Sequence, residues 1–225
     1  MRWLQPDEER RAFRFRMTRS DRRRWEAARS LAEVATLTAE WLEGGIESQP
    51  GYQPGYGPAA ETAGLIGVLA ATNRAGLLTH GSQPGEEVTD DDGRVWRQRA
   101  AVDLHVPTGL AERLIDQFRG TGLTVIRESR ILGRDVIGTV DMLRHDGALG
   151  CTTCDGVPMT AFGGREPDRS VRFRYAGLDG DAVDEICAAD QVTIADTAWG
   201  RNDRLWPLLE AAVAQHHNPR RTDHP

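Results

Sequence analysis

The spacing of apolar residues changes between two periods along this chain, and this limits the folds that it can adopt. From Trp96 to Val106 the even positions are mostly apolar while the odd positions include arginine, aspartate and histidine, which predicts a strand with one wet face. Leu110, Leu114 and Phe118 then recur every four residues, which predicts a helix. Because such strands and helices follow one another in mixed order, the sequence predicts an α+β fold.

The same patterns predict the other elements. Helices are expected over residues 21–43 (capped by Ser20), 60–75, 181–189 and 203–215 (capped by Asn202). Strands are expected over 77–80, 123–127, 134–143, 171–175 and 192–196, with a short strand near 159–162 in a Gly-rich, irregular span. A turn is expected over 81–85, and an exposed acidic connection over 86–93. The tandem Pro-Gly-Tyr between Ser48 and Pro58 predicts a loop.

The charge distribution predicts how the chain is organised. All 28 basic residues are arginine, which excludes lysine-dependent Schiff-base and phosphate-loop chemistry and is typical of a GC-rich genome. The first 30 residues hold ten arginines and five acids, so they carry +5; the net charge of −6 then leaves −11 for the rest. We therefore expect an Arg-rich N-terminal helical arm with its loop over residues 1–58, an α+β core over 59–217 and a polar tail over 218–225.

Length, cysteine content and hydropathy indicate the general class of protein. The 225 residues suit one domain with an appended arm, and three cysteines are too few and odd in number for a disulfide framework. No stretch approaches the ~20 apolar residues of a membrane span, and the charged N-terminus lacks a signal core. We therefore expect a cytoplasmic protein without membrane contact. Common hydrolase, metalloprotease and dinucleotide-binding motifs are missing, which weakens those enzyme classes.

Cys151-Thr-Thr-Cys154 has the spacing of a metal or redox pair. A structural zinc site needs four ligands, and a second such pair is missing, although His216-His217 could in principle complete a site. We expect free thiols here and no bound metal.

The segment from Glu61 to Ser82 carries the best candidate ligand site. Glu61 and Thr62 stand at the first turn of a predicted helix, and Thr79 and Ser82 stand where a strand enters a Pro-Gly turn. Taken singly, each has a structural explanation, such as a favourable helix dipole or a local turn hydrogen bond. Together they offer a carboxylate, hydroxyls and turn amides to a small polar ligand with a cationic or amino group.

Over about residues 60–215, the chain resembles the C-terminal regulatory domain of eukaryotic methylenetetrahydrofolate reductase. The more specific part of the likeness is the block from Asn73 through Thr79 to Ser82-Gln-Pro84. Weaker blocks follow in the same order: Trp96 to Ala100, Gly133 to Ile137 with Thr139 and Asp141, Val192 to Asp196, and Asn202 to Trp206.

The resemblance implies a fold and a ligand. That domain has two mixed β-sheets side by side, surrounded by helices, and it binds S-adenosylmethionine or S-adenosylhomocysteine. The residues of this chain that match its ligand contacts are Glu61, Thr62, Thr79, Ser82 and Thr139. The resemblance thus predicts a non-catalytic module that binds either ligand. As our own hypothesis, such a sensor signals to a protein partner through the N-terminal helix and the Pro-Gly-Tyr loop, which lie outside the matching region. No flavin-binding barrel precedes the matching region, so reductase activity is not implied.

Other hypotheses stay open beside this one. Arg127 falls where the family has a hydroxyl contact and the loop before Thr139 is shorter, which suggests a ligand-free interaction module of the same fold. A cofactor pocket can also host chemistry, so an enzyme that uses S-adenosylmethionine, with Glu61, Asp141 or His80 as its base, is the third hypothesis. Binding of DNA by the Arg-rich arm is the fourth. The oligomeric state is not predicted.

Overall fold

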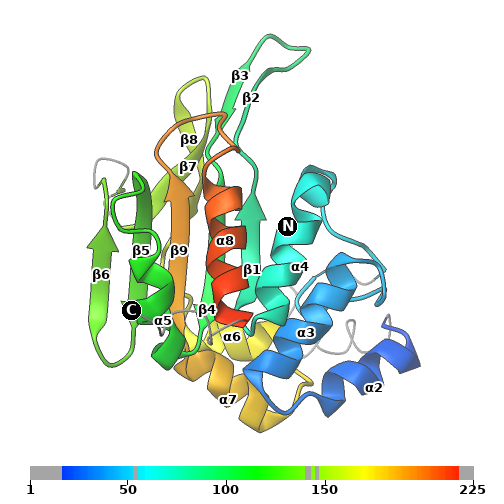
Figure 1. Cartoon of the computed structure of the whole chain (residues 1–225). Coiled ribbons are helices and arrows are strands. Elements are labelled where there is room, and N and C mark those ends of the chain that lie inside the picture. Colours follow the sequence, from blue (N-terminus) through cyan, green and yellow to red (C-terminus); the bar gives the residue numbers. More distant parts are fainter. Residues whose placement is uncertain (1–16, 53–54, 140–142, 145–146, 218–225) are drawn as a thin grey trace.

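A computed structural model describes residues 17–52, 55–139, 143–144 and 147–217 of the chain (Figure 1). The predicted α+β class with two sheets is confirmed: a five-stranded sheet has the order β1-β4-β9-β5-β6, and a four-stranded sheet has the order β2-β3-β7-β8. The strands of both sheets pair antiparallel throughout, rather than in the mixed arrangement that we expected. None of the described helices is long and apolar enough to cross a bilayer.

The strands of the larger sheet are β1 (Leu78–Gln83), β4 (Ala101–Val106), β9 (Asp190–Asp196), β5 (Leu123–Ser129) and β6 (Gly133–Ile137). Those of the smaller sheet are β2 (Glu86–Thr89), β3 (Val95–Gln98), β7 (Leu149–Cys154) and β8 (Val157–Phe162). The helices are α2 (Arg19–Ala27), α3 (Leu31–Leu42), the 3-10 helix η1 (Ala60–Leu65), α4 (Ile66–Arg74), α5 (Thr108–Asp116), α6 (Asp168–Arg174), α7 (Gly180–Ala188) and α8 (Leu205–His217).

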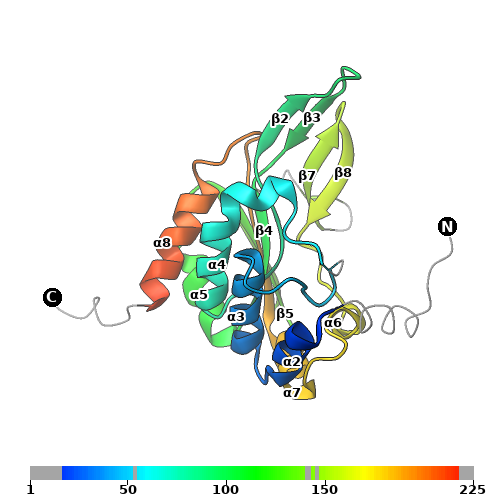
Figure 2. The same ribbon diagram turned by 90° about the vertical axis from the view of Figure 1, so that its right-hand side faces the viewer.

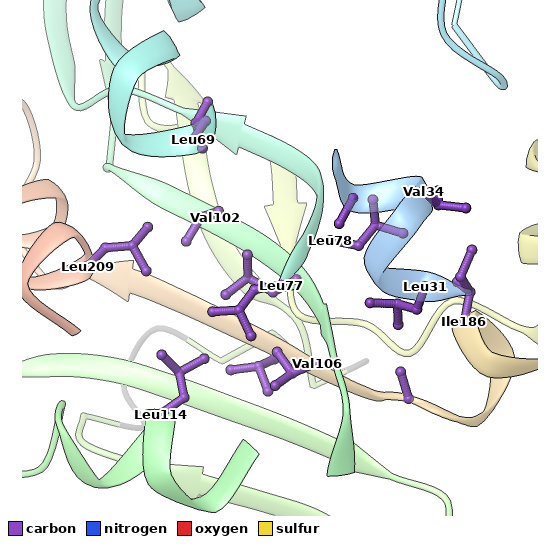
Figure 3. Close-up of a cluster of buried hydrophobic side chains, with 14 of the residues drawn as sticks. Leu31, Val34, Leu69, Leu77, Leu78, Val102, Val106, Leu114, Ile186 and Leu209 are labelled. Carbon is purple, nitrogen blue, oxygen red and sulfur yellow. The ribbon is translucent and has the colours of Figure 1, made fainter. Parts of the chain in front are cut away.

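The main core lies between the larger sheet and the helices on one of its faces. Helices α3, α4, α5 and α8 pack against that face, which Figure 2 shows from the side. Alternation along β4 sends Val102, Leu104 and Val106 into this core, while Asp103 and His105 take the opposite face. Figure 3 shows the central side chains, with Leu31 and Val34 of α3 among them.

Helices α2 and α3, which we expected in an appended arm, contribute to this same core. Trp25, Leu31 and Val34 are buried in it, and α3 packs on α4 and β1. The single helix expected over 21–43 is two helices, because Ser30 starts a new one by accepting a hydrogen bond from the backbone N–H of Glu33. Thr18, not Ser20, caps the first.

Several predicted strands differ in the structure for reasons of tertiary context. The strand expected over 96–106 divides at Arg99 and Ala100 into β3 and β4, which belong to different sheets. The turn and connection expected from 81 to 93 instead contain the end of β1 and all of β2. Residues 171–175 lie in and just after helix α6, because Val171 and Tyr175 are four apart and share one buried helix face.

The Gly-rich span after residue 144 contains the β7–β8 hairpin. Its turn is Asp155-Gly156, and both residues have positive φ, as a two-residue hairpin turn of this type requires. An Asp-Gly pair is a recognised hairpin signal in a sequence, so this element could have been predicted. The strand expected over 134–143 ends at Ile137.

Candidate functional site

A cavity of about 290 Å³ lies between helix α3, residues 49–52 and 58–59, the η1–α4 segment and the edge strand β1. Four of the five residues that the sequence predicted as ligand contacts line it, although they come from two separate elements: Glu61 and Thr62 of η1, and Thr79 and Ser82 of β1. Its remaining lining residues are Thr38, Trp41, Leu42, Gln49, Tyr52, Pro58, Ala59, Leu69, His80 and Gly81.

A β-bulge at His80 explains how Thr79 and Ser82 reach the same cavity. In a regular strand, residues three apart point to opposite faces. In β1 the register shifts between Thr79 and Gly81, so that Thr79 pairs with Leu104 and Ser82 pairs with Val102. Because Val102 and Leu104 share the core face of β4, the extra residue puts both hydroxyls on the helix-covered side of the sheet.

Buried Asn73, at the end of α4, fixes Thr79. Its side-chain amide donates to the Thr79 hydroxyl (2.7 Å) and to the Leu69 carbonyl (2.8 Å), while its oxygen accepts from the Thr79 backbone N–H (3.1 Å). The three bonds join the helix to the strand at the cavity. The Asn73-to-Thr79 block of the sequence thus has a structural role in positioning this wall.

The Pro-Gly-Tyr loop forms another wall of the cavity. The Tyr52 ring meets Trp41 of α3 edge-on, with ring centroids 5.3 Å apart. The Trp41 indole N–H donates to the Tyr56 carbonyl (3.2 Å), and the Trp25 indole N–H donates to the Ser48 carbonyl (2.8 Å). Both ends of the loop are therefore tied to the first two helices.

Gln83, next to Ser82, connects the two sheets. Its amide N–H groups donate to the backbone carbonyls of Arg99 (2.8 Å) and Cys151 (3.0 Å), and its oxygen accepts from the Thr152 hydroxyl (3.3 Å). Asn202, expected as a helix cap, instead exchanges two 2.7 Å hydrogen bonds with the backbone of Gly85. The Ser-Gln-Pro block therefore holds the end of β1 in place.

The structure does not bring Thr139 to this cavity. Thr139 is exposed just after β6, and β1 and β6 are the opposite edges of the five-stranded sheet. Four strand spacings of roughly 4.8 Å separate these edges, which is about 19 Å. Asp141 lies outside the described residues.

Arg127, which we expected near the ligand, is engaged elsewhere. It is buried on β5, and its guanidinium bonds to Asp190 (2.6 Å) and Glu112 (2.6 Å). Arg127 does not line the cavity.

Cys151 and Cys154 have free thiols, but they lie on strand β7 rather than in the irregular span that we expected. Burial raises the pKa of the Cys151 thiol to about 12, which makes it a poor metal ligand and nucleophile. The side chains of His216 and His217 lie outside the described residues.

A partly buried polar cluster beside the cavity was missed by the sequence analysis. The donor atoms of His80, His105 and Glu166 all lie within 4.8 Å of one another, and they could hold a metal ion. The two imidazole rings are 4.8 Å apart between centroids. The signal was present in the alternation of residues 101–106, but we interpreted the polar face of that strand as wet, whereas His105 is fully buried.

Burial controls the protonation of this cluster. It lowers the pKa of His80 well below the usual value and that of His105 to about 4, with the neighbouring positive charge of Arg174 acting in the same direction. Burial also raises the pKa of Asp103, on the same face of β4, to about 7. Both imidazoles are therefore neutral near pH 7.

Comparison with known proteins assigns the chain to a family without assigning an activity. No curated protein matches it. A family model described as a domain of unknown function, DUF6919, matches residues 20–216. This range includes all described strands and all described helices, except for the first residue of α2 and the last residue of α8. The chain therefore belongs to the DUF6919 family.

Proposed function

We propose that this protein is a non-catalytic binding module that senses S-adenosylmethionine or S-adenosylhomocysteine in the cavity beside β1. One observation supports the proposal above others. Glu61, Thr62, Thr79 and Ser82, which the family resemblance singled out, line a single cavity in the structure. Its volume of about 290 Å³ lies just below the ~300–1,000 Å³ range of small-molecule sites.

The lining suits the chemistry of such a ligand. The Glu61 carboxylate can pair with the ligand's ammonium group or accept from ribose hydroxyls, while the hydroxyls of Thr79 and Ser82 can donate to its carboxylate. Trp41 and Tyr52 offer aromatic surface, which attracts a sulfonium cation as well as a purine ring. Because S-adenosylhomocysteine lacks the sulfonium charge, a contact of the sulfur with these rings would favour S-adenosylmethionine.

Helix α3 gives such a sensor a route to a partner. Thr38, Trp41 and Leu42 of α3 line the cavity, so a ligand in the cavity would contact this helix and the loop that follows it. We propose the surface of residues 17–58 as the contact for a protein partner, and the reducing cytoplasm as the location, in keeping with the free thiols.

The hypothesis of a ligand-free module loses its main support, because Arg127 is paired on β5 and does not line the cavity. A second candidate function is an enzyme that cleaves or transfers a group from S-adenosylmethionine. The observation that favours it is His80, which lines the cavity and has a pKa low enough for a neutral base.

Calorimetry with purified protein tests the binding function. We expect S-adenosylmethionine, S-adenosylhomocysteine or both to bind, and Glu61→Gln and Ser82→Ala to weaken binding by about tenfold each, equivalent to about 1.4 kcal/mol. Thr139→Val is the matched control, because Thr139 also matches a ligand contact of the family but does not line the cavity. This variant should bind the ligand as tightly as the parent protein does. The absence of heat and of any thermal shift at millimolar ligand would sink the proposal. Labelled S-adenosylmethionine recovered intact after binding would exclude the enzyme.

A further inference from the structure

We propose that His80, His105 and Glu166 bind one divalent first-row transition-metal ion, such as Zn²⁺ or Fe²⁺, through two imidazole nitrogens and one carboxylate oxygen. Among the residues that the structure describes, these three form the one group of histidine, cysteine and acidic side chains whose donor atoms converge in this way. Two imidazoles and a carboxylate are a donor set that suits both ions. The proposal goes beyond the binding function above, which needs no metal.

Three different elements hold the three donors. His80 is the extra residue of the bulge in β1, and His105 is on the adjacent strand β4. Glu166 precedes α6, and its backbone exchanges two hydrogen bonds with the Gln191 side chain of β9, at 2.6 and 3.0 Å. The donors are therefore fixed by the sheet itself, as a preformed metal site requires.

The cluster leaves buried polar atoms that a metal ion would satisfy. Neither ring nitrogen of His105 has a hydrogen-bond partner among the described residues, although the side chain is fully buried. The Glu166 Oε2 atom is likewise buried without a partner. An unmet buried group of this kind is costly, so binding an ion here would remove a penalty as well as add bonds.

The distances fit a metal ion after a small adjustment. Ligand atoms at about 2.1 Å from a tetrahedral zinc ion are about 3.4 Å apart. The donors in the structure lie within 4.8 Å of one another, so side-chain shifts on the order of 1 Å bring them onto one ion.

The neighbouring charges orient the carboxylate. The Arg174 guanidinium donates to Glu166 Oε1 at 2.9 Å, which leaves Oε2 for the metal. Such an outer partner commonly fixes a ligating side chain. Asp103, whose side chain accepts a hydrogen bond from the Thr193 hydroxyl, lies on the same face of β4 as His105.

Three protein ligands leave coordination positions for other groups. A catalytic zinc site typically has three protein ligands and an open fourth position, whereas structural sites are closed. His80 lines the cavity as well as the cluster, so it joins the metal site to the space in which a ligand would lie. The open position would take water or an oxygen or nitrogen donor of a bound small molecule.

Metal titration of the untagged full-length protein tests the proposal without any nucleoside ligand. Chelator-treated protein carrying His216→Ala and His217→Ala, to exclude metal binding by those histidines, is titrated with Co²⁺ as a visible probe. Zn²⁺, and Fe²⁺ under anaerobic conditions, are added in separate experiments as competitors of Co²⁺. We expect one Co²⁺ per chain, absorption bands typical of nitrogen and oxygen ligands, and displacement by whichever of the two ions the site prefers.

Glu166→Gln should weaken Co²⁺ binding by about 100-fold or more, because losing even an outer partner commonly costs 10–100-fold. Glu128→Gln is the matched control: Glu128 has the same 14% side-chain exposure and also pairs with one arginine, at 3.0 Å. His80→Asn, at the half-buried bulge, is the second variant, with circular dichroism as the check of folding. The proposal fails if Co²⁺ does not bind, if a thiolate charge-transfer band appears, or if Glu166→Gln and Glu128→Gln bind Co²⁺ equally well.

Discussion

Gly51 and Gly55 hold equivalent positions in the two Pro-Gly-Tyr repeats, yet their surroundings differ. Both have positive φ, +76° and +75°. A Cβ on Gly51 would lie 2.2 Å from Cγ of Arg174, whereas a Cβ on Gly55 would have no atom within 4 Å. The first repeat therefore packs onto the arginine that orients Glu166, while the second needs glycine only for its backbone conformation.

These two glycines make a matched pair of variants. Gly55→Ala should lower the free energy of unfolding by about 1–2 kcal/mol, the cost of a left-handed conformation for an L-residue. Gly51→Ala should cost clearly more, since it also displaces Arg174. Urea denaturation measures both. Equal losses in the two variants would mean that the loop does not rest on Arg174.

The residue scale also shows which of the positions singled out from the sequence come together in space. Glu61, Thr62, Thr79 and Ser82 were recognised as a group, and the structure brings them to one cavity. The bulge that makes this possible was not predicted, because the sequence of β1 carries no alternation that would show it. His80, His105 and Glu166 come together only through strand pairing, which no local pattern reveals.

Arg127 is the side chain through which strand β5, strand β9 and helix α5 are joined electrostatically. It bonds to fully buried Asp190 at the start of β9 and to Glu112 of α5. Removing one partner of a buried pair leaves an uncompensated charge in the protein interior.

Arg127→Met should therefore lower the free energy of unfolding by about 3–5 kcal/mol, and Asp190→Asn in the same chain should restore part of it. Binding in the cavity should change little in protein that stays folded, because Arg127 does not line it. Arg172→Met, which breaks the exposed pair with Asp184, is the control and should leave the urea midpoint nearly unchanged. A small loss for Arg127→Met would show that water reaches the buried pair.

Helices and strands were predicted well where the apolar periodicity extends over many residues, and poorly where long-range contacts determine the structure. The helix around Leu110 and Leu114 and the strand β9 were found, because their periodicity extends over several buried positions. The division of residues 96–106 between two sheets could not be predicted, since the alternation continues across Arg99. Over five residues, the spacing of Val171 and Tyr175 suits either a strand or a helix.

At the scale of the whole molecule, the two sheets differ in how they are protected. All seven residues of β9, in the centre of the larger sheet, are buried, whereas all four residues of the edge strand β2 are exposed. Regions with few buried contacts open locally at lower free energy than the core.

The mixed order of patterns predicted the α+β class, but the allocation of strands to two sheets depends on long-range contacts.

Hydrogen exchange followed by mass spectrometry tests this difference. Amides of β2 should exchange through local opening, orders of magnitude faster than those of β9, which should exchange only with global unfolding. The exchange rate of peptides covering β9 should also rise with urea concentration, while that of peptides covering β2 should not change. Equal protection of the two strands would mean that the smaller sheet opens only together with the larger one.

The bulge at His80 makes the length of this segment as important as its composition. Because one extra residue puts Thr79 and Ser82 on the same face, deletion of any single residue between them would turn one hydroxyl away from the cavity, even with both residues retained. Insertions there would act in the same way. Chains of this family that differ by one residue between the threonine and the serine should therefore present only one of the two hydroxyls to the cavity, whatever side chains they keep.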